Sequence, residues 1–169
     1  MSVLDIVIKG DESLTQKAQA VTDFKLDKVQ ENVSDMIDTM RHYQGVGLAA
    51  PQIGLLQRII VLEVANNKRY PQAENIELDI LINPEILECS QQTEIGWEGC
   101  LSIPGFRGEV LRPVSITYQA LNLTQELLIK TVYGFHARII QHEIDHLNGI
   151  LFTQRMTGSM LKPEKNLSF

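Results

Sequence analysis

The chain has 169 residues, of which 44% are hydrophobic and 21% charged, as is typical of an ordinary globular protein. This length suits one domain over residues 1–169, and the formal net charge of −6 disfavours general nucleic-acid binding, because phosphate backbones repel acidic surfaces. Two cysteines are too few for a secreted disulfide framework, and no apolar run is long enough to span a membrane, so we expect a soluble cytoplasmic protein.

The first half of the chain predicts helices and then strands. Asp11 can cap a short helix, and apolar residues recur every three to four positions over about 26–43, which predicts a long amphipathic helix. This helix ends at the segment Gly45 to Gly47, where glycine permits a loop with close backbone approach. Short apolar and β-branched runs predict strands at 58–65, 78–83, 85–93, 114–121 and 126–133. We therefore expect an α+β fold with small antiparallel or mixed sheets.

The last strong element is a helix over about 135–148, which Gly149 ends. Ile140, Ile144 and Leu147 lie on one face, whereas His142 and His146 lie together on the nearly opposite face. One side of this helix can therefore pack into a core while the other carries chemistry. The segment 153–169 has too few apolar residues for any element to be assigned.

A His-Glu-x-x-His motif occupies this helix at His142, Glu143 and His146. Because residues four apart stand one turn apart, both imidazoles can converge on one metal ion, and Glu143 points about 100° aside, toward an open ligand position. The simpler alternative is a solvent-facing helix with two unrelated histidines. The apolar opposite face disfavours that alternative, because it indicates a helix that is buried on both sides.

Two histidines need a third ligand to hold a metal ion. Downstream, Glu164 lies in a polar tail that makes a poor platform, whereas Cys100 lies upstream between strand-like segments and beside glycine. The Cys100 thiolate is therefore the better candidate. We expect the other cysteine, Cys89, to be a small buried hydrophobic side chain.

Three separated motifs make the chain resemble the peptide deformylases. In the order of that family they are Gly45-Val-Gly-Leu-Ala-Ala-Pro-Gln52, Glu98-Gly-Cys-Leu-Ser102 and Gln141-His-Glu-Ile-Asp-His146. The resemblance extends from the first helix to about Phe152. It implies an α+β fold with small antiparallel sheets around a central metal-bearing helix, and it implies removal of the formyl group from the starting methionine of new polypeptides.

The resemblance also implies a role for individual residues. The implied metal ligands are Cys100, His142 and His146, with water at a fourth position. Glu143 resembles the general acid and base, and Gln52 with the backbone N–H of Leu101 resembles the pair that binds the formyl oxygen as it gains charge. The residues expected to bind substrate are Gly45, Val46 and Gly47, which pair with the extended peptide, and Ile139, Arg107, Arg138 and Phe106 around the methionine side chain. For Ile139 and Phe106, plain core packing is an equally good explanation.

The donor set suits several divalent ions, and the resemblance implies Fe²⁺ in the cell, with Zn²⁺, Ni²⁺ or Co²⁺ as replacements. The expected partners are N-formyl-Met peptides and nascent chains. A contact with the ribosome near the exit tunnel is in doubt, because the long C-terminal helix of many deformylases does not follow Phe152 here. Two other functions stay open: an endopeptidase on the same helix, and a closed structural metal site in which His136 or Cys89 replaces water.

Overall fold

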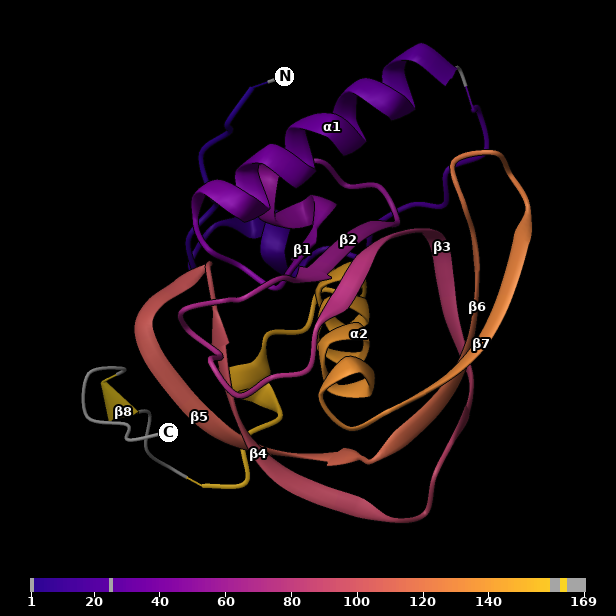
Figure 1. Cartoon of the computed structure of the whole chain (residues 1–169). Helices are drawn as coiled ribbons and strands as arrows, with labels where there is room; N and C mark the ends of the chain where they lie inside the picture. The colour runs from indigo at the N-terminus through magenta and orange to yellow at the C-terminus, as the bar shows by residue number, and fades with distance from the viewer. Residues whose placement is uncertain (1, 25, 159–161, 164–169) are drawn as a thin grey trace.

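The fold is described from a computed structural model, which covers residues 2–24, 26–158 and 162–163 (Figure 1). Within these ranges the chain forms two α-helices, three short 3-10 helices (η) and eight strands. In chain order they are η1 (Glu12–Thr15), α1 (Leu26–His42), β1 (Gly47–Ala49), η2 (Ala50–Ile53), β2 (Ile59–Val64), β3 (Ile76–Cys89), β4 (Thr93–Cys100), β5 (Ile103–Pro113), β6 (Ser115–Leu121), β7 (Leu127–Tyr133), α2 (Gly134–Leu147), η3 (Phe152–Gln154) and β8 (Lys162–Pro163).

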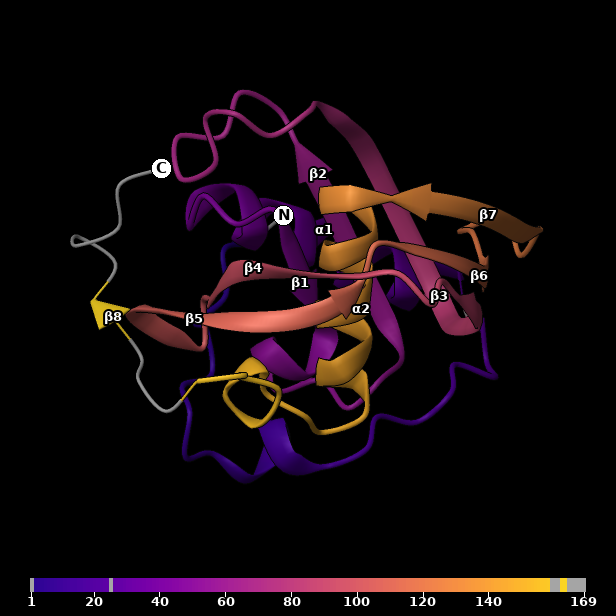
Figure 2. The same cartoon turned by 90° about the horizontal axis from the view of Figure 1, so that it is seen from below.

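The strands form two sheets, one with the order β1-β2-β3-β6-β7 and one with the order β4-β5-β8. Every pairing between these strands is antiparallel. The two sheets and the η3 segment surround α2, and α1 lies outside this arrangement against β1 and β2 (Figure 1). Seen from below, β4 and β5 cross one side of α2, and the larger sheet lies on its other side (Figure 2). The predicted α+β class with antiparallel sheets is confirmed.

The strands β2, β6 and β7 confirm three of the predicted strands to within one or two residues. The runs predicted at 78–83 and 85–93 instead form one long strand, β3, which ends at Cys89. Its pairing with β6 shifts register between Ile82 and Glu85, at a position where Asn83 has a φ of 53°. A β-bulge of this kind bends a strand and tolerates a proline, so Pro84 interrupts the apolar pattern without ending the strand.

Helix α2 is buried along most of its length. Every residue from Ile139 to Leu147 is buried, because the helix packs against both sheets and against η2. It ends as predicted: Gly149 has a left-handed φ of 72°, and a Cβ atom there would clash with the carbonyl oxygen of Thr15. Both faces of α2, the polar one included, are thus shielded from water.

Candidate active site

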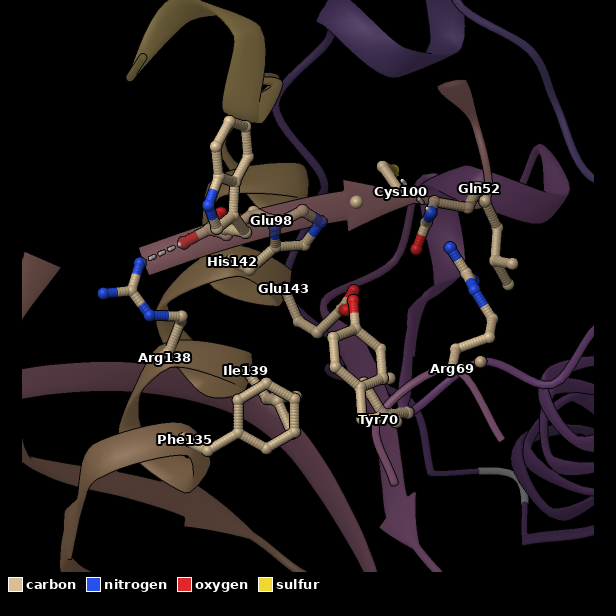
Figure 3. Close-up of a pocket in the computed structure, with 16 residues that line it drawn as sticks. Gln52, Arg69, Tyr70, Glu98, Cys100, Phe135, Arg138, Ile139, His142 and Glu143 are labelled. Atoms are coloured by element: carbon tan, nitrogen blue, oxygen red, sulfur yellow. Dashed lines mark hydrogen bonds and ion pairs between the residues drawn. The ribbon is translucent and has the colours of Figure 1, made fainter. Parts of the chain in front are cut away.

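The three predicted metal donors converge between β4 and α2. The donor atoms of Cys100, His142 and His146 all lie within 4.8 Å of one another, and Cys100 Sγ lies 3.2 Å from His146 Nε2. All three side chains are buried. Cys100 ends β4 where the chain turns into β5, and the two histidines stand one turn apart on α2. Figure 3 shows Cys100 across the pocket from His142.

This donor set fits a divalent metal ion. A thiolate with two imidazoles is a usual ligand set for zinc and related ions, and it leaves one position open. Burial lowers the pKa of His146 well below its ordinary value, so its imidazole is neutral and keeps a lone pair for a metal. Among the residues that the structure describes, this group has three members, and neither His136 nor Cys89 belongs to it.

The carboxylate of Glu98 orients the imidazole ring of His142. His142 Nδ1 donates to Glu98 Oε2 at 2.8 Å, which leaves Nε2 available as the candidate metal donor. Burial alone would raise the pKa of Glu98, but hydrogen bonds from His142 and Arg112 outweigh it and hold the pKa below its ordinary value. Arg112 donates to both Glu98 oxygens, at 2.6 and 3.0 Å, and Arg138 donates to one of them at 3.0 Å. Glu98 is therefore charged and held in one position.

Arg112 also pairs with a second buried carboxylate, that of Asp145 on α2. Its Nη1 donates to Asp145 Oδ2 at 2.8 Å, and Asp145 also accepts from Arg155 at 2.9 and 3.3 Å. Breaking a buried pair of this kind leaves an uncompensated charge, which is strongly destabilising. The network therefore fixes β4 against α2 at the level of the three candidate donors.

Glu143 is the acidic group inside the pocket. Its side chain is buried, and its Oε2 has no hydrogen-bond partner among the described residues. Burial raises its pKa to about 7, so the carboxyl group can both take up and release a proton near neutral pH. A Cβ atom on Gly47 would lie 2.5 Å from Glu143 Oε1. A glycine at position 47 therefore lets the backbone of β1 pass directly beside the carboxyl group.

Gln52 is held so that its amide nitrogen faces the candidate donor Cys100. The backbone N–H of Ala49 donates to Gln52 Oε1 at 2.9 Å, which fixes the orientation of the amide group. Gln52 Nε2 then points to Cys100 Sγ at 3.4 Å and to Ser102 Oγ at 3.3 Å. Leu101 lies in the turn between β4 and β5 and lines the same pocket.

One pocket brings these groups together (Figure 3). Of the predicted site residues, the structure places in its lining Gly45, Val46, Gly47, Gln52, Cys100, Leu101, Arg138, Ile139, His142 and Glu143. His146 is not part of this lining, but it belongs to the donor group. The wall away from the metal donors is apolar and is formed by Tyr70, Phe135 and Ile139.

Three residues lie elsewhere than predicted. The Arg107 side chain is buried outside the pocket lining, with its guanidinium over the Tyr70 ring at 4.4 Å from the ring centroid, so it supports the wall from behind. Phe106 is 42% exposed on β5 and does not line the pocket. The expectation of a buried Cys89 is wrong: this residue is exposed at the end of β3.

The structure also adds residues that the sequence patterns did not indicate. Arg69 and Tyr70 reach the pocket from the long connection between β2 and β3. Phe135 reaches it from the first turn of α2. Glu98 belongs to the Glu98-Gly-Cys-Leu-Ser102 motif, and that motif could have indicated that Glu98 is a functional residue. Its contact with His142, however, depends on how β4 packs on α2.

A buried Cys-His-His donor group beside an unpartnered carboxyl is the arrangement of metal-dependent hydrolases. The family model of polypeptide deformylase matches residues 3–162. Peptide deformylase 1 of Nitrosomonas europaea is 45% identical over 147 residues, which cover 87% of this chain and 84% of that protein. Peptide deformylase of Natranaerobius thermophilus is 43% identical, over 92% of this chain and 93% of that protein.

Solved structures agree with the sequence comparison. The crystal structure of class I type b peptide deformylase from Acinetobacter baumannii with bound Met-Ala-Ser has a TM-score of 0.89 and 40% identity, and the match covers 92% of this chain and all of that chain. Peptide deformylase from Thermotoga maritima has a TM-score of 0.85 and 39% identity. The chain therefore belongs to the polypeptide deformylase family of metal-dependent enzymes, which remove the N-formyl group from newly made polypeptides and release formate.

Proposed function

We propose that this chain, as one domain over residues 1–169, deformylates the starting methionine of nascent chains at the pocket between β4 and α2. The main observation that supports this proposal is that Cys100, His142 and His146 converge at the same pocket as the unpartnered carboxyl group of Glu143. The proposed cofactor is one divalent ion, Fe²⁺ in the cell, with Zn²⁺, Ni²⁺ or Co²⁺ able to replace it. The chemistry that such an ion supplies is Lewis acidity toward water and the formyl oxygen.

Other groups around the donors have separate roles in the proposed reaction. Glu143 takes a proton from the attacking water and delivers it to the methionine nitrogen as the formyl C–N bond breaks, which yields formate and a free amine. Gln52 Nε2 and the backbone N–H of Leu101 donate to the formyl oxygen as it becomes negative. The fixed orientation of the Gln52 amide supports this role, because a preorganised donor costs no reorganisation during the reaction.

The shape of the pocket supports the choice of methionine. Its apolar wall of Tyr70, Phe135 and Ile139 suits a flexible thioether side chain. The backbone of Gly45 to Gly47 can pair with an extended peptide, as an added strand would. In the described part of the chain, no helix is long and apolar enough to cross a membrane. Nascent chains place the proposed activity in the cytoplasm, where the ribosomal exit tunnel delivers them.

The activity is tested with purified protein loaded with Fe²⁺ under low oxygen. A formyl-Met peptide should lose one formyl group and release one formate per peptide, and a chelator should stop the reaction. Mass spectrometry checks the product and an enzymatic formate assay checks the stoichiometry. Cleavage of internal peptide bonds with the same metal dependence would instead favour an endopeptidase. Loading with Zn²⁺, Ni²⁺ or Co²⁺ tests the choice of metal.

Gln52→Leu should reduce kcat by about 10²- to 10³-fold with the metal content unchanged, because it removes one donor to the oxyanion. Leucine also removes the acceptor for the Ala49 N–H, so Gln52→Glu is a useful second variant: it keeps that acceptor and still loses the donor. Steady-state kinetics and elemental analysis check both variants. The exposed Gln91→Leu is the control and should leave kcat unchanged. A near-normal kcat in both Gln52 variants would contradict the role.

A further inference from the structure

Phe152 lies against one of the candidate donors. Its ring is nearly parallel to the imidazole of His142, with 25° between the ring planes and 6.1 Å between the ring centroids. Aromatic rings attract each other over this range of separations. Phe152 is 1% exposed and is not part of the pocket lining, whereas His142 is. A substrate in the pocket would therefore meet His142 but not Phe152, so any influence of Phe152 on the reaction passes through the residues that it contacts.

The turn that carries Phe152 is held in place at both ends. Phe152 begins η3, the short helix that follows α2 and lies beside β4 and β5 (Figure 1). The Leu151 N–H donates to Gln154 Oε1 at 2.8 Å, which closes the turn on itself. Arg155 then joins the end of the turn to α2, because its guanidinium donates to both carboxylate oxygens of Asp145, at 2.9 and 3.3 Å. The ring of Phe152 therefore has a fixed position relative to α2.

The same ring also belongs to the apolar surroundings of the candidate donor on β4. One buried cluster contains Leu14, Cys100, Ile103, Val110, Leu151 and Phe152. These residues come from η1, from both strands of the β4–β5 hairpin and from the beginning of η3. Because Phe152 also stacks on His142, it links the surroundings of the donor on β4 to a donor on α2.

Glu98 alone leaves the plane of the His142 ring partly free. Its hydrogen bond to Nδ1 fixes one atom of the ring, but such a bond keeps much of its strength over about 30° of misalignment. A functional site needs its groups within about 10–20° of the productive geometry. The buried ring of Phe152 supplies the missing restraint, because a close-packed interior leaves no room for the imidazole to tilt toward it.

We propose that Phe152 is a positioning residue, which sets the plane of the His142 imidazole so that Nε2 is already oriented when the metal ion binds. The inference rests on the proposed metal site and deformylase function, and it adds a role for a residue outside the pocket. A ring that is oriented in advance loses less freedom on binding, so a protein without the Phe152 ring should bind the ion more weakly. The expected loss of affinity is about threefold to tenfold.

Three substitutions separate the flat ring from the packing that it provides. Phe152→Leu and Phe152→Met keep an apolar side chain but lose the ring, and they should bind Zn²⁺ about threefold to tenfold more weakly than the wild type. Phe152→Tyr keeps the ring but adds a hydroxyl group at a buried position, which lowers the stability of the fold. It should nevertheless bind Zn²⁺ like the wild type. A purely structural role predicts instead that affinity falls with stability in all three variants.

Competition with a chelator measures the Zn²⁺ affinity of the full-length protein, and thermal unfolding with and without Zn²⁺ measures its stability. Co²⁺ adds a spectroscopic readout, because its visible absorption depends on the geometry of the donors. The Co²⁺ bands should shift in Phe152→Leu and Phe152→Met and stay in place in Phe152→Tyr. At saturating metal, KM for a formyl-Met peptide should be unchanged in all three variants, because the pocket lining is intact.

The matched control is Phe24→Leu, which makes the same chemical change in a partly buried residue. Phe24 packs against the cluster that contains the buried residues of α1, so this variant should keep the wild-type affinity and Co²⁺ spectrum. If Phe152→Leu does not fold, Phe152→Met decides the question, because a methionine side chain adapts to irregular spaces in a core.

Wild-type affinity with an unchanged Co²⁺ spectrum in a folded Phe152→Leu or Phe152→Met would overturn the inference. An affinity that falls in step with thermal stability across all three variants would overturn it as well. A wild-type protein that binds Zn²⁺ but fails to hydrolyse a formyl-Met peptide would contradict the proposed function alone, whereas a wild-type protein that binds no metal would contradict both.

Discussion

Cys100→Ser should lose both metal and activity, whereas Cys89→Ser should keep both. A hydroxyl is a much poorer donor than a thiolate to zinc or ferrous iron, and loss of a supporting residue alone commonly costs 10- to 100-fold in metal affinity. Loss of the ligand itself should therefore weaken metal binding by at least about 100-fold. Elemental analysis after dialysis and competition with a chelator measure the affinity, and formate release measures the activity.

The cysteine pair offers a matched control because both changes replace sulfur by oxygen. Cys89 is exposed at the end of β3 and lies outside the donor group, so its replacement tests the chemical change alone. Thermal unfolding monitored by circular dichroism should show that both variants fold. Equal metal content in the wild type and in a folded Cys100→Ser would contradict the assignment of Cys100 as a ligand.

The donors on α2 could be predicted because their spacing is local. Two histidines four residues apart meet on one face of any helix, whatever the rest of the fold does. The support from Glu98 could not be predicted in this way. Its contact with His142 spans 44 residues of sequence and depends on how β4 packs against α2. No periodicity within either element carries that information.

The hairpin that carries Cys100 was the part of the fold that sequence patterns missed. Strands β4 and β5 contain four glycines at positions 96, 99, 105 and 108, which weaken any strand pattern. Ile95 and Leu111 pair across this hairpin but are 54% and 47% exposed. These apolar residues therefore do not indicate a buried face of the hairpin. The glycines have a tertiary role: a Cβ atom on Gly96 would lie 2.7 Å from the Arg138 guanidinium carbon.

The connection between β2 and β3 is a second place where local patterns carry little information. Its polar sequence indicates a loop, as the structure shows, but not where the loop lies. Arg69 and Tyr70 reach the pocket because Asn67 bonds to the backbone before β1 and because the Tyr70 ring rests on Arg107. These contacts join distant segments, so they appear only once the fold is known.

Glu143→Gln separates metal binding from proton transfer. The variant keeps the size of the side chain, so it should still fit beside Gly47, and the three donors are untouched. It should therefore retain its metal and bind a formyl-Met peptide with near-normal affinity. General acid–base catalysis contributes about 10²- to 10⁴-fold, and kcat should fall by at least that factor because in the proposed reaction Glu143 both accepts and delivers the proton.

The outcome of Glu143→Gln discriminates between three roles for this carboxyl group. Retained metal with a large loss of kcat supports proton transfer, because the glutamine can no longer accept a proton at neutral pH. Loss of the metal would make Glu143 a ligand or a support for one, and retained metal with near-normal turnover would contradict the proposed reaction altogether. Elemental analysis, peptide binding by calorimetry and single-turnover formate release give the three readouts. The exposed Glu109→Gln makes the same chemical change on β5 and should leave all three unchanged.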